Sequence, residues 1–254
     1  MQSLKLAFQF LLFPVMLFAL FTGCRKDSLK GELVEGQIAL TFDDNSIDNW
    51  FKYMPLLDSL NIKATFYISG YQDLTKIQKN KLHTIAHHGH EIAYHTTSHP
   101  NMVTMVEKNG IVKTLEQEID TGLTLMRQDG FEITNFAYPY GRHNQTLDVG
   151  LKRYFKSIRA VSNKQNYSKS LVKKSGERQL YYGADIDECS RLGDDVLFNL
   201  LSQAQVYHDC LVLVAHKINT PNYKFQVTAD RLRKLAVEAD KRNLQFITIK
   251  DIGL

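Results

Sequence analysis

Two adjacent aspartates, Asp43 and Asp44, follow the apolar run at residues 38–42, and their position suits hydrolytic chemistry. One carboxylate of such a pair can bind a metal ion, while its neighbour accepts a proton from the attacking water. The metal ion would also polarise the carbonyl group that is cleaved. The alternative is a structural role, since aspartate is a favoured residue at helix N-termini.

Two histidines, His95 and His99, stand four residues apart after a second apolar run at residues 91–94. Two imidazoles and one carboxylate are a familiar ligand set for zinc or another divalent first-row metal ion, with room left for water. The two rings would lie on one side if residues 96–99 formed one helical turn. The alternative is a pair that only fills a turn, but the aspartates after a neighbouring run favour the metal site.

Two further segments could complete a hydrolase. Residues 139–141 read Pro-Tyr-Gly, which predicts a tight turn whose backbone N–H could bind an oxyanion. His216 ends the apolar run at residues 211–215 and could protonate a departing amine or alkoxide. Four segments therefore offer two carboxylates, three imidazoles and a turn to one reaction.

The elements that must position these residues are short β-rich runs that alternate with longer helical ones. Predicted strands cover residues 38–42, 64–69, 91–94, 133–138, 157–161, 180–184, 211–215 and 245–249, and predicted helices cover residues 49–60, 75–87, 103–129, 145–154, 194–208 and 227–242. Repeated βα units of this number predict one α/β domain, a (β/α) barrel of seven or eight parallel strands. An open doubly wound sheet is the alternative. In a barrel, the reactive residues would gather at the C-terminal ends of the strands.

Length and composition describe an ordinary folded protein. The chain has 254 residues, of which 44% are hydrophobic and 23% charged, so it can bury a sizeable core and is not a disordered chain. The formal net charge is only +4, and charges of both signs are mixed along the chain. We therefore expect no nucleic-acid partner.

The first residues predict export. Lys5 precedes an apolar stretch at residues 6–21, and Phe21-Thr22-Gly23-Cys24 resembles a bacterial lipoprotein cleavage box. We expect a lipoprotein-type signal peptide at residues 1–23, a polar tether at 24–36 and one domain at 37–254. A lipid on Cys24 would anchor the protein to a membrane of the bacterial cell envelope, facing the periplasm or the cell surface. The alternatives are an uncleaved anchor or a plain signal peptide.

The motifs taken together resemble those of the NodB-homology polysaccharide deacetylases, carbohydrate esterase family four. They are Thr41-Phe42-Asp43-Asp44, His95-Thr96-Thr97-Ser98-His99-Pro100 and Leu211-Val212-Leu213-Val214-Ala215-His216, in the family's order. The resemblance spans residue 37 to the C-terminus and implies the family's distorted (β/α) barrel. It implies these roles: Asp43 as catalytic base, Asp44, His95 and His99 as metal ligands, His216 as catalytic acid, and Tyr140 as donor of the oxyanion N–H. It also implies that the site binds one divalent metal ion, with zinc as the first candidate and cobalt, nickel or manganese as alternatives.

One position departs from the family pattern. Many members carry an Arg two residues before the Pro of the third motif, where it orients the base, but this chain has Ala137. The Ala-Tyr-Pro-Tyr-Gly form resembles the branch that acts on poly-N-acetylglucosamine. Arg142 and Arg178 are candidates to steady Asp43 instead.

The resulting hypothesis is a metal-dependent hydrolase that removes acetyl groups from a polysaccharide, with N-deacetylation of a GlcNAc-containing glycan favoured. One alternative is an O-acetyl esterase of the xylan type on the same scaffold. Another is a carbohydrate-binding lipoprotein that has lost catalysis. Asp185 and Asp187 are both candidates to orient the acid, His216.

Overall fold

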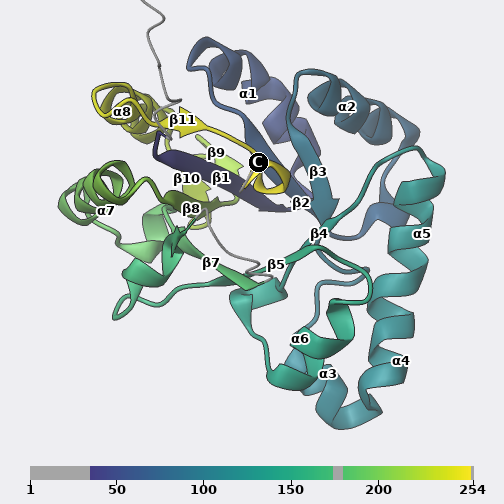
Figure 1. The fold of residues 1–254 in the computed structure, drawn as a ribbon. Coiled ribbons are helices and arrows are strands. Elements are labelled where there is room, and N and C mark those ends of the chain that lie inside the picture. Colours follow the sequence, from purple (N-terminus) through teal and green to yellow (C-terminus); the bar gives the residue numbers. More distant parts are fainter. Residues whose placement is uncertain (1–34, 174–179, 253–254) are drawn as a thin grey trace, which may run out of the picture. The chain divides into compact units, whose positions relative to one another are not determined.

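Seven parallel strands close into a barrel in the computed structural model, which describes residues 35–173 and 180–252. The strands are β1 (Gln37–Asp44), β2 (Ala64–Ile68), β3 (Glu91–Tyr94), β4 (Asn135–Ala137), β5 (Ser157–Val161), β7 (Leu180–Asp185) and β8 (Cys210–Ala215). They pair in this order, and β8 pairs back with β1 (Figure 1). The predicted (β/α) barrel is therefore confirmed, and the open sheet is excluded.

The pairing of β1 with β8, here called the β1–β8 seam, closes the barrel. It runs in register from Gln37 opposite Cys210 to Phe42 opposite Ala215. Because parallel strands in register end at the same level, the seam places the residues after Phe42 beside the residue after Ala215.

The eighth predicted strand lies outside the ring. It is only β11 (Gln245–Phe246), which pairs in parallel with the first two residues of β1. Since β2 begins opposite Leu40, that part of the β1 edge is left for β11. The remaining short strands are β6 (Leu171–Val172), antiparallel to β8, and the pair β9 (Lys217–Ile218) and β10 (Gln226–Val227).

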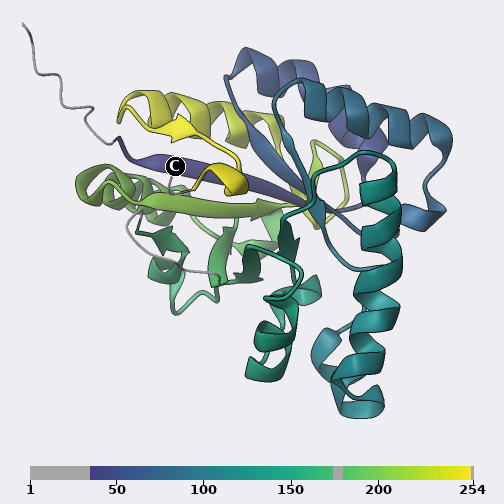
Figure 2. The same cartoon turned by 45° about the vertical axis from the view of Figure 1, so that its right-hand side comes forward.

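Helices surround the barrel on its outer face (Figures 1 and 2). They include α1 (Ile47–Ser59), α2 (Lys76–His87), α6 (Gln145–Leu151), α7 (Asp194–Tyr207) and α8 (Ala229–Asp240). Short 3₁₀ turns cover Tyr71–Asp73, Pro139–Gly141, Tyr167–Ser170, Glu188–Ser190 and Ile249–Asp251. The core between helices and strands includes Phe42, Trp50 and Phe66, which are buried and pack ring against ring. Such apolar burial is the main stabilising contribution to the fold.

The prediction of one continuous helix at residues 103–129 is wrong. It is divided into α3 (Met102–Asn109), α4 (Ile111–Leu115), a π-helical turn at Glu116–Asp120 and α5 (Thr121–Gln128). Gly110 has a φ of 76°, which interrupts the helix and which glycine tolerates without steric cost. The π turn is wider than an α turn, and its residue Glu118 is buried.

The expected signal peptide and most of the tether lie outside the described residues, and so does Cys24. Within residues 35–173 and 180–252, no helix has the length and apolar character needed to cross a membrane.

Candidate active site

Asp44, His95 and His99 converge at the C-terminal ends of β1 and β3. One ligand atom from each lies within 4.8 Å of the other two. The Asp44 Oδ1 atom is 3.1 Å from His99 Nε2 and 3.8 Å from His95 Nε2. This oxygen is buried and has no hydrogen-bond partner in the described part of the chain. A buried carboxylate oxygen facing two imidazole nitrogens fits a divalent metal ion.

The ring orientation of His95 supports the same conclusion. Its Nδ1 lies 2.8 Å from the Ala137 carbonyl oxygen, so Nδ1 carries the proton and Nε2 keeps its lone pair toward Asp44. Metal-binding histidines are commonly held in this way. Burial lowers the pKa of His95 to about 4, which keeps the ring neutral, as a ligand must be.

The segment at residues 95–100, here called the histidine loop, does not form the expected helical turn. Thr96 and His99 have φ values of 74° and 57°, in the left-handed region. The Thr96 hydroxyl accepts a hydrogen bond from the His99 N–H at 3.0 Å, and this bond together with the positive φ angles makes a local non-helical turn. The rings converge because of this turn, so the predicted grouping holds although its predicted backbone is wrong.

Glu118, which the sequence reasoning missed, braces the histidine loop. Its carboxylate accepts hydrogen bonds from the Ser98 backbone N–H at 2.9 Å and from the Ser98 hydroxyl at 2.7 Å. Its backbone carbonyl accepts from the Thr97 N–H at 3.1 Å and from the Tyr94 hydroxyl at 3.0 Å. Three bonds from one residue therefore hold the loop that carries both histidines, and a fourth ties it to Tyr94 at the end of β3.

Positive φ angles recur around the site. Asp44 has a φ of 87°, and Tyr140, in the Pro139–Gly141 turn, has a φ of 60°. Non-glycine residues adopt such angles at an energetic cost, and they concentrate at functional sites. The Tyr140 ring is exposed and packs edge-on against His99, with ring centroids 4.9 Å apart. The turn thus lies next to the candidate metal ligands Asp44, His95 and His99, as the oxyanion hypothesis requires.

Asp43 is buried and paired with an arginine that the sequence reasoning did not propose. The Arg159 Nη2 atom donates to both carboxylate oxygens of Asp43. The two arginines predicted as candidates to steady Asp43 are Arg142 and Arg178. Arg142 is exposed, and Arg178 lies outside the described residues. One signal was present in the sequence: Arg159 is a charged residue in the middle of a strand expected to be covered on both faces.

His216 follows β8 and is held by Asp187. Its Nδ1 lies 2.5 Å from Asp187 Oδ2, and its backbone N–H donates to Asp187 Oδ1 at 3.3 Å. Burial alone would lower the pKa of His216, but Asp187 and the nearby Asp43 and Asp44 raise it to about 9. The buried Trp50 indole N–H donates to the His216 carbonyl at 2.7 Å. Of the two candidates for orienting the acid, Asp187 makes the contact.

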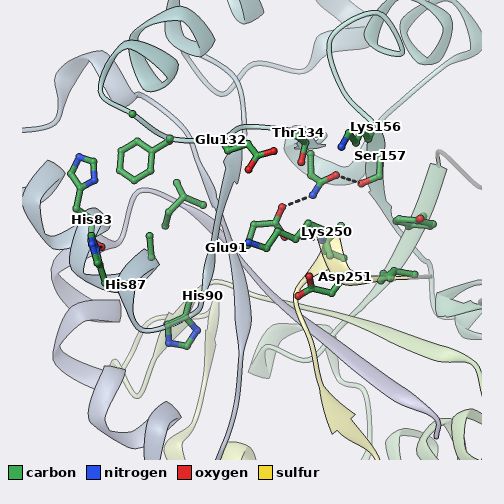
Figure 3. Close-up of a pocket in the computed structure, with 18 residues that line it drawn as sticks. His83, His87, His90, Glu91, Glu132, Thr134, Lys156, Ser157, Lys250 and Asp251 are labelled. Carbon is green, nitrogen blue, oxygen red and sulfur yellow. Dashed lines mark hydrogen bonds between the residues drawn. The ribbon is translucent and has the colours of Figure 1, made fainter. Parts of the chain in front are cut away.

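A cavity of about 610 Å³ lies at the other end of the barrel, where β3, β4 and β5 begin (Figure 3). Buried Glu91 accepts hydrogen bonds there from the Thr65 hydroxyl at 2.7 Å, from the Asn135 amide, and from the Lys250 N–H at 3.0 Å. These bonds satisfy the carboxylate and close the end of the barrel. This cavity is separate from the metal-ligand cluster.

Comparison with known proteins identifies the family. Residues 30–154 match the polysaccharide deacetylase family model. The chain is 27% identical over 226 residues to a peptidoglycan-N-acetylglucosamine deacetylase of Bacillus cereus, covering 87% of this chain and 70% of that protein. It is 27% identical over 136 residues to a bifunctional xylanase/deacetylase of Pseudobutyrivibrio xylanivorans, covering 52% of this chain but only 22% of that protein.

Solved structures share the fold. The Xyl-CE4 domain of a multidomain xylanase from the hindgut metagenome of Trinervitermes trinervoides superposes with a TM-score of 0.57 at 18% identity, covering 86% of this chain and 89% of that one. Peptidoglycan deacetylase PdaC from Bacillus subtilis gives 0.55 at 18% identity, with coverage of 86% and 90%. The family match, the Bacillus cereus relative and the barrel agree. The chain therefore belongs to the polysaccharide deacetylase family of hydrolases.

Proposed function

We propose that this chain is a metal-dependent deacetylase that hydrolyses N-acetyl groups of a GlcNAc-containing polysaccharide. The observation that carries the proposal is one juxtaposition at the β1–β8 seam. The carboxylate Asp43 and the three candidate metal ligands lie on one side of the seam, and the Asp187–His216 pair lies on the other. A base, a ligand cluster and an acid around one point make up the parts of a hydrolase.

Each part has a proposed task. A divalent metal ion, with zinc as the first candidate, would be held by Asp44, His95 and His99. It would supply Lewis-acid polarisation of the acetyl carbonyl. Asp43 accepts a proton from the attacking water. The Tyr140 N–H donates a hydrogen bond to the oxygen on which negative charge develops.

His216 completes the reaction as the acid. Asp187 holds the Nδ1 side of the ring, so Nε2 is the atom that gives its proton to the departing amine. A pKa of about 9 keeps the imidazole protonated at neutral pH, which is the form an acid needs. The acetyl group leaves as acetate, and the glycan keeps a free amine.

The substrate preference rests on the similarity to the Bacillus cereus peptidoglycan-N-acetylglucosamine deacetylase. The match to a bifunctional xylanase/deacetylase supports the O-acetyl esterase as a second candidate. An alkoxide leaving group would take its proton from His216 in the same way as an amine.

We further propose that the protein works in the cell envelope. Residues 1–23 would be the export signal, 24–36 the tether and 37–254 the catalytic domain. A lipid on Cys24 would hold the domain near acetylated glycans outside the cytoplasm. Mass spectrometry of the membrane fraction would detect a diacylglyceryl-modified Cys24, and an unmodified Cys24 would overturn this part of the proposal.

Acetate release by the full-length chain in detergent tests the function. The substrates are N-acetylated peptidoglycan, N-acetylglucosamine oligomers and O-acetylated xylan, each assayed after chelation and after zinc is restored. We expect release from the N-acetylated glycans, lost on chelation and absent in D43N. Faster release from xylan would favour the esterase, and glycan binding without release would overturn both.

A further inference from the structure

Arg159 is a fully buried cation inside the barrel. It stands at the middle of β5, its side chain is 0% exposed, and Asp43 with 5% exposure is its ion-pair partner. The guanidinium also lies over the Tyr67 ring, 5.0 Å from its centroid. Within the described residues, Arg159 Nε and Nη1 have no hydrogen-bond partner. Asp43 is therefore the one group that the guanidinium binds by hydrogen bonds in this part of the chain.

Burying a charged guanidinium inside the barrel costs free energy. Burying a charge requires a partner, and replacing a buried ion pair by apolar residues often leaves stability unchanged or raises it. The two unpartnered nitrogens add to the desolvation cost. Stability alone therefore does not account for Arg159 well, whereas the need to fix the orientation of Asp43 does.

The contact defines where the Asp43 carboxylate points. Arg159 Nη2 engages both oxygens, and Asp43 Oδ2 stays 3.9 Å from His95 Nε2. Without the guanidinium, nothing in these contacts would keep that carboxylate from turning toward the ligand cluster. The arginine thus separates the candidate base from the candidate ligands.

Arg159 has a specific neighbour on the adjacent strand. In the register of β4 and β5, Ala137 is its direct Cα partner. Residues paired in register on parallel strands point to the same face of the sheet, and Ala137 also packs inside the barrel, in the cluster that contains Tyr67. Its small side chain leaves space for the guanidinium beside it.

We propose that Arg159 is the positioning residue of the catalytic base, and that positions 137 and 159 are interchangeable sites for it. This inference rests on the proposed function, because it needs Asp43 to act as the base. An arginine at either position starts from the same level of the barrel and reaches the same carboxylate. This chain has no arginine at position 137, and Arg159 on β5 orients Asp43 in its place.

The test compares R159A, R159K and the exchange variant A137R/R159A in the full-length chain. We expect R159A to lose about 10²-fold in kcat, because a misplaced base is as harmful as a weak one, with KM and bound zinc little changed. The exchange variant should recover most of the lost kcat. If Arg159 were purely structural, its removal would lower the melting temperature without a selective loss of kcat. An arginine placed at position 137 on β4 would then not restore kcat.

Controls separate the possible failures. Arg231 on α8 bonds to the Leu192 carbonyl and to Asp194, neither of which is a candidate site residue, so R231A should keep wild-type kcat. If R159A does not fold, R159K and the exchange variant still decide the question. A folded, zinc-loaded R159A or R159K with wild-type kcat, or an exchange variant that folds without recovery, overturns the inference while the proposed function stands. A wild-type chain that is inactive on every acetylated glycan overturns both.

Discussion

Asp187 makes two hydrogen bonds with His216. Its Oδ2 lies 2.5 Å from the ring Nδ1, and its Oδ1 accepts from the His216 backbone N–H at 3.3 Å. The side chain of Asp187 is fully buried, whereas that of His216 keeps 19% of its surface exposed. Nδ1 of the ring is therefore held against a buried carboxylate, while part of the side chain stays accessible. This contact fixes the orientation of the imidazole, and it leaves Nε2 as the nitrogen that the proposed acid would use.

Replacing Asp187 by Asn should remove the charge that orients His216 while the side-chain volume is kept. We expect kcat for acetate release to fall by about 10²–10⁴-fold, the usual contribution of a general acid, with zinc content unchanged. D185N is a comparison rather than a neutral control: within the described residues Asp185 accepts from the Asp187 backbone N–H at 2.8 Å and makes no hydrogen bond to His216, so its loss of kcat should be smaller than that of D187N. Equal kcat in D187N and the wild type would contradict the role of Asp187.

The pH dependence of the same pair can be measured without substrate or metal. The pKa of His216 is raised from its usual 6.5 to about 9, through the hydrogen bond with Asp187 and the charges of Asp43 and Asp44, against the opposing effect of burial. A raised folded-state pKa stabilises the protein fully below pH 6.5, and this contribution is lost as the pH rises through about 9. NMR titration of the chelated protein should show the high pKa, and D187N should lower it. A value near 6.5 in the wild type would contradict the expected pairing.

Removing a candidate ligand should remove the metal. In D44A or H99A, we expect zinc binding and acetate release to be lost together, since each variant leaves two protein ligands where structural and catalytic zinc sites have three or four. H88A is the control, because His88 is exposed, pairs with Asp58 and lies before the start of β3, at the opposite end of that strand. Metal analysis of the purified variants decides the matter: full zinc occupancy in both would remove Asp44 and His99 from the ligand set.

Glu118 should affect metal affinity although it touches no ligand ring. E118Q replaces one of the carboxylate oxygens that accept from Ser98 by an NH₂ group, which loosens the histidine loop. Supporting contacts of this kind are worth about 10–100-fold in metal affinity. Competition with a chromogenic chelator would measure the loss, with E116Q, an exposed neighbour on the π turn, as the control. Unchanged zinc affinity in E118Q would show that the loop does not depend on this brace.

The sequence predicted the barrel and the grouping of its reactive residues because both follow from local patterns. The short β-rich runs identified all seven barrel strands within a few residues, and the reactive residues lie at or just after the ends of those strands. The contacts of Arg159 and Asp187 could not be read in this way. They join residues 116 and 29 positions apart, and which partner meets Asp43 or His216 depends on register and on the barrel interior.

Local backbone geometry was the other part that the pattern could not supply. The spacing of His95 and His99 is compatible with a helical turn, yet the Thr96 hydroxyl competes for the His99 N–H and produces a different turn. Gly110 is tolerated inside a helix, and only its positive φ shows that it divides one. Apolar periodicity continues across both features, so it predicts the elements but not their interruptions.

The β1–β8 seam also determines when the enzyme can first act. It joins segments about 170 residues apart, for example through the Thr41 hydroxyl, which donates to the Leu213 carbonyl at 2.8 Å. Contacts of such long sequence separation are slow to form, because a large loop must close before they stabilise anything. A chain still being synthesised or translocated has the aspartates and histidines but no β8, and so no acid. Turnover would thus begin only after β8, the last strand of the barrel, docks, which makes acetate release a direct assay for closure of the barrel.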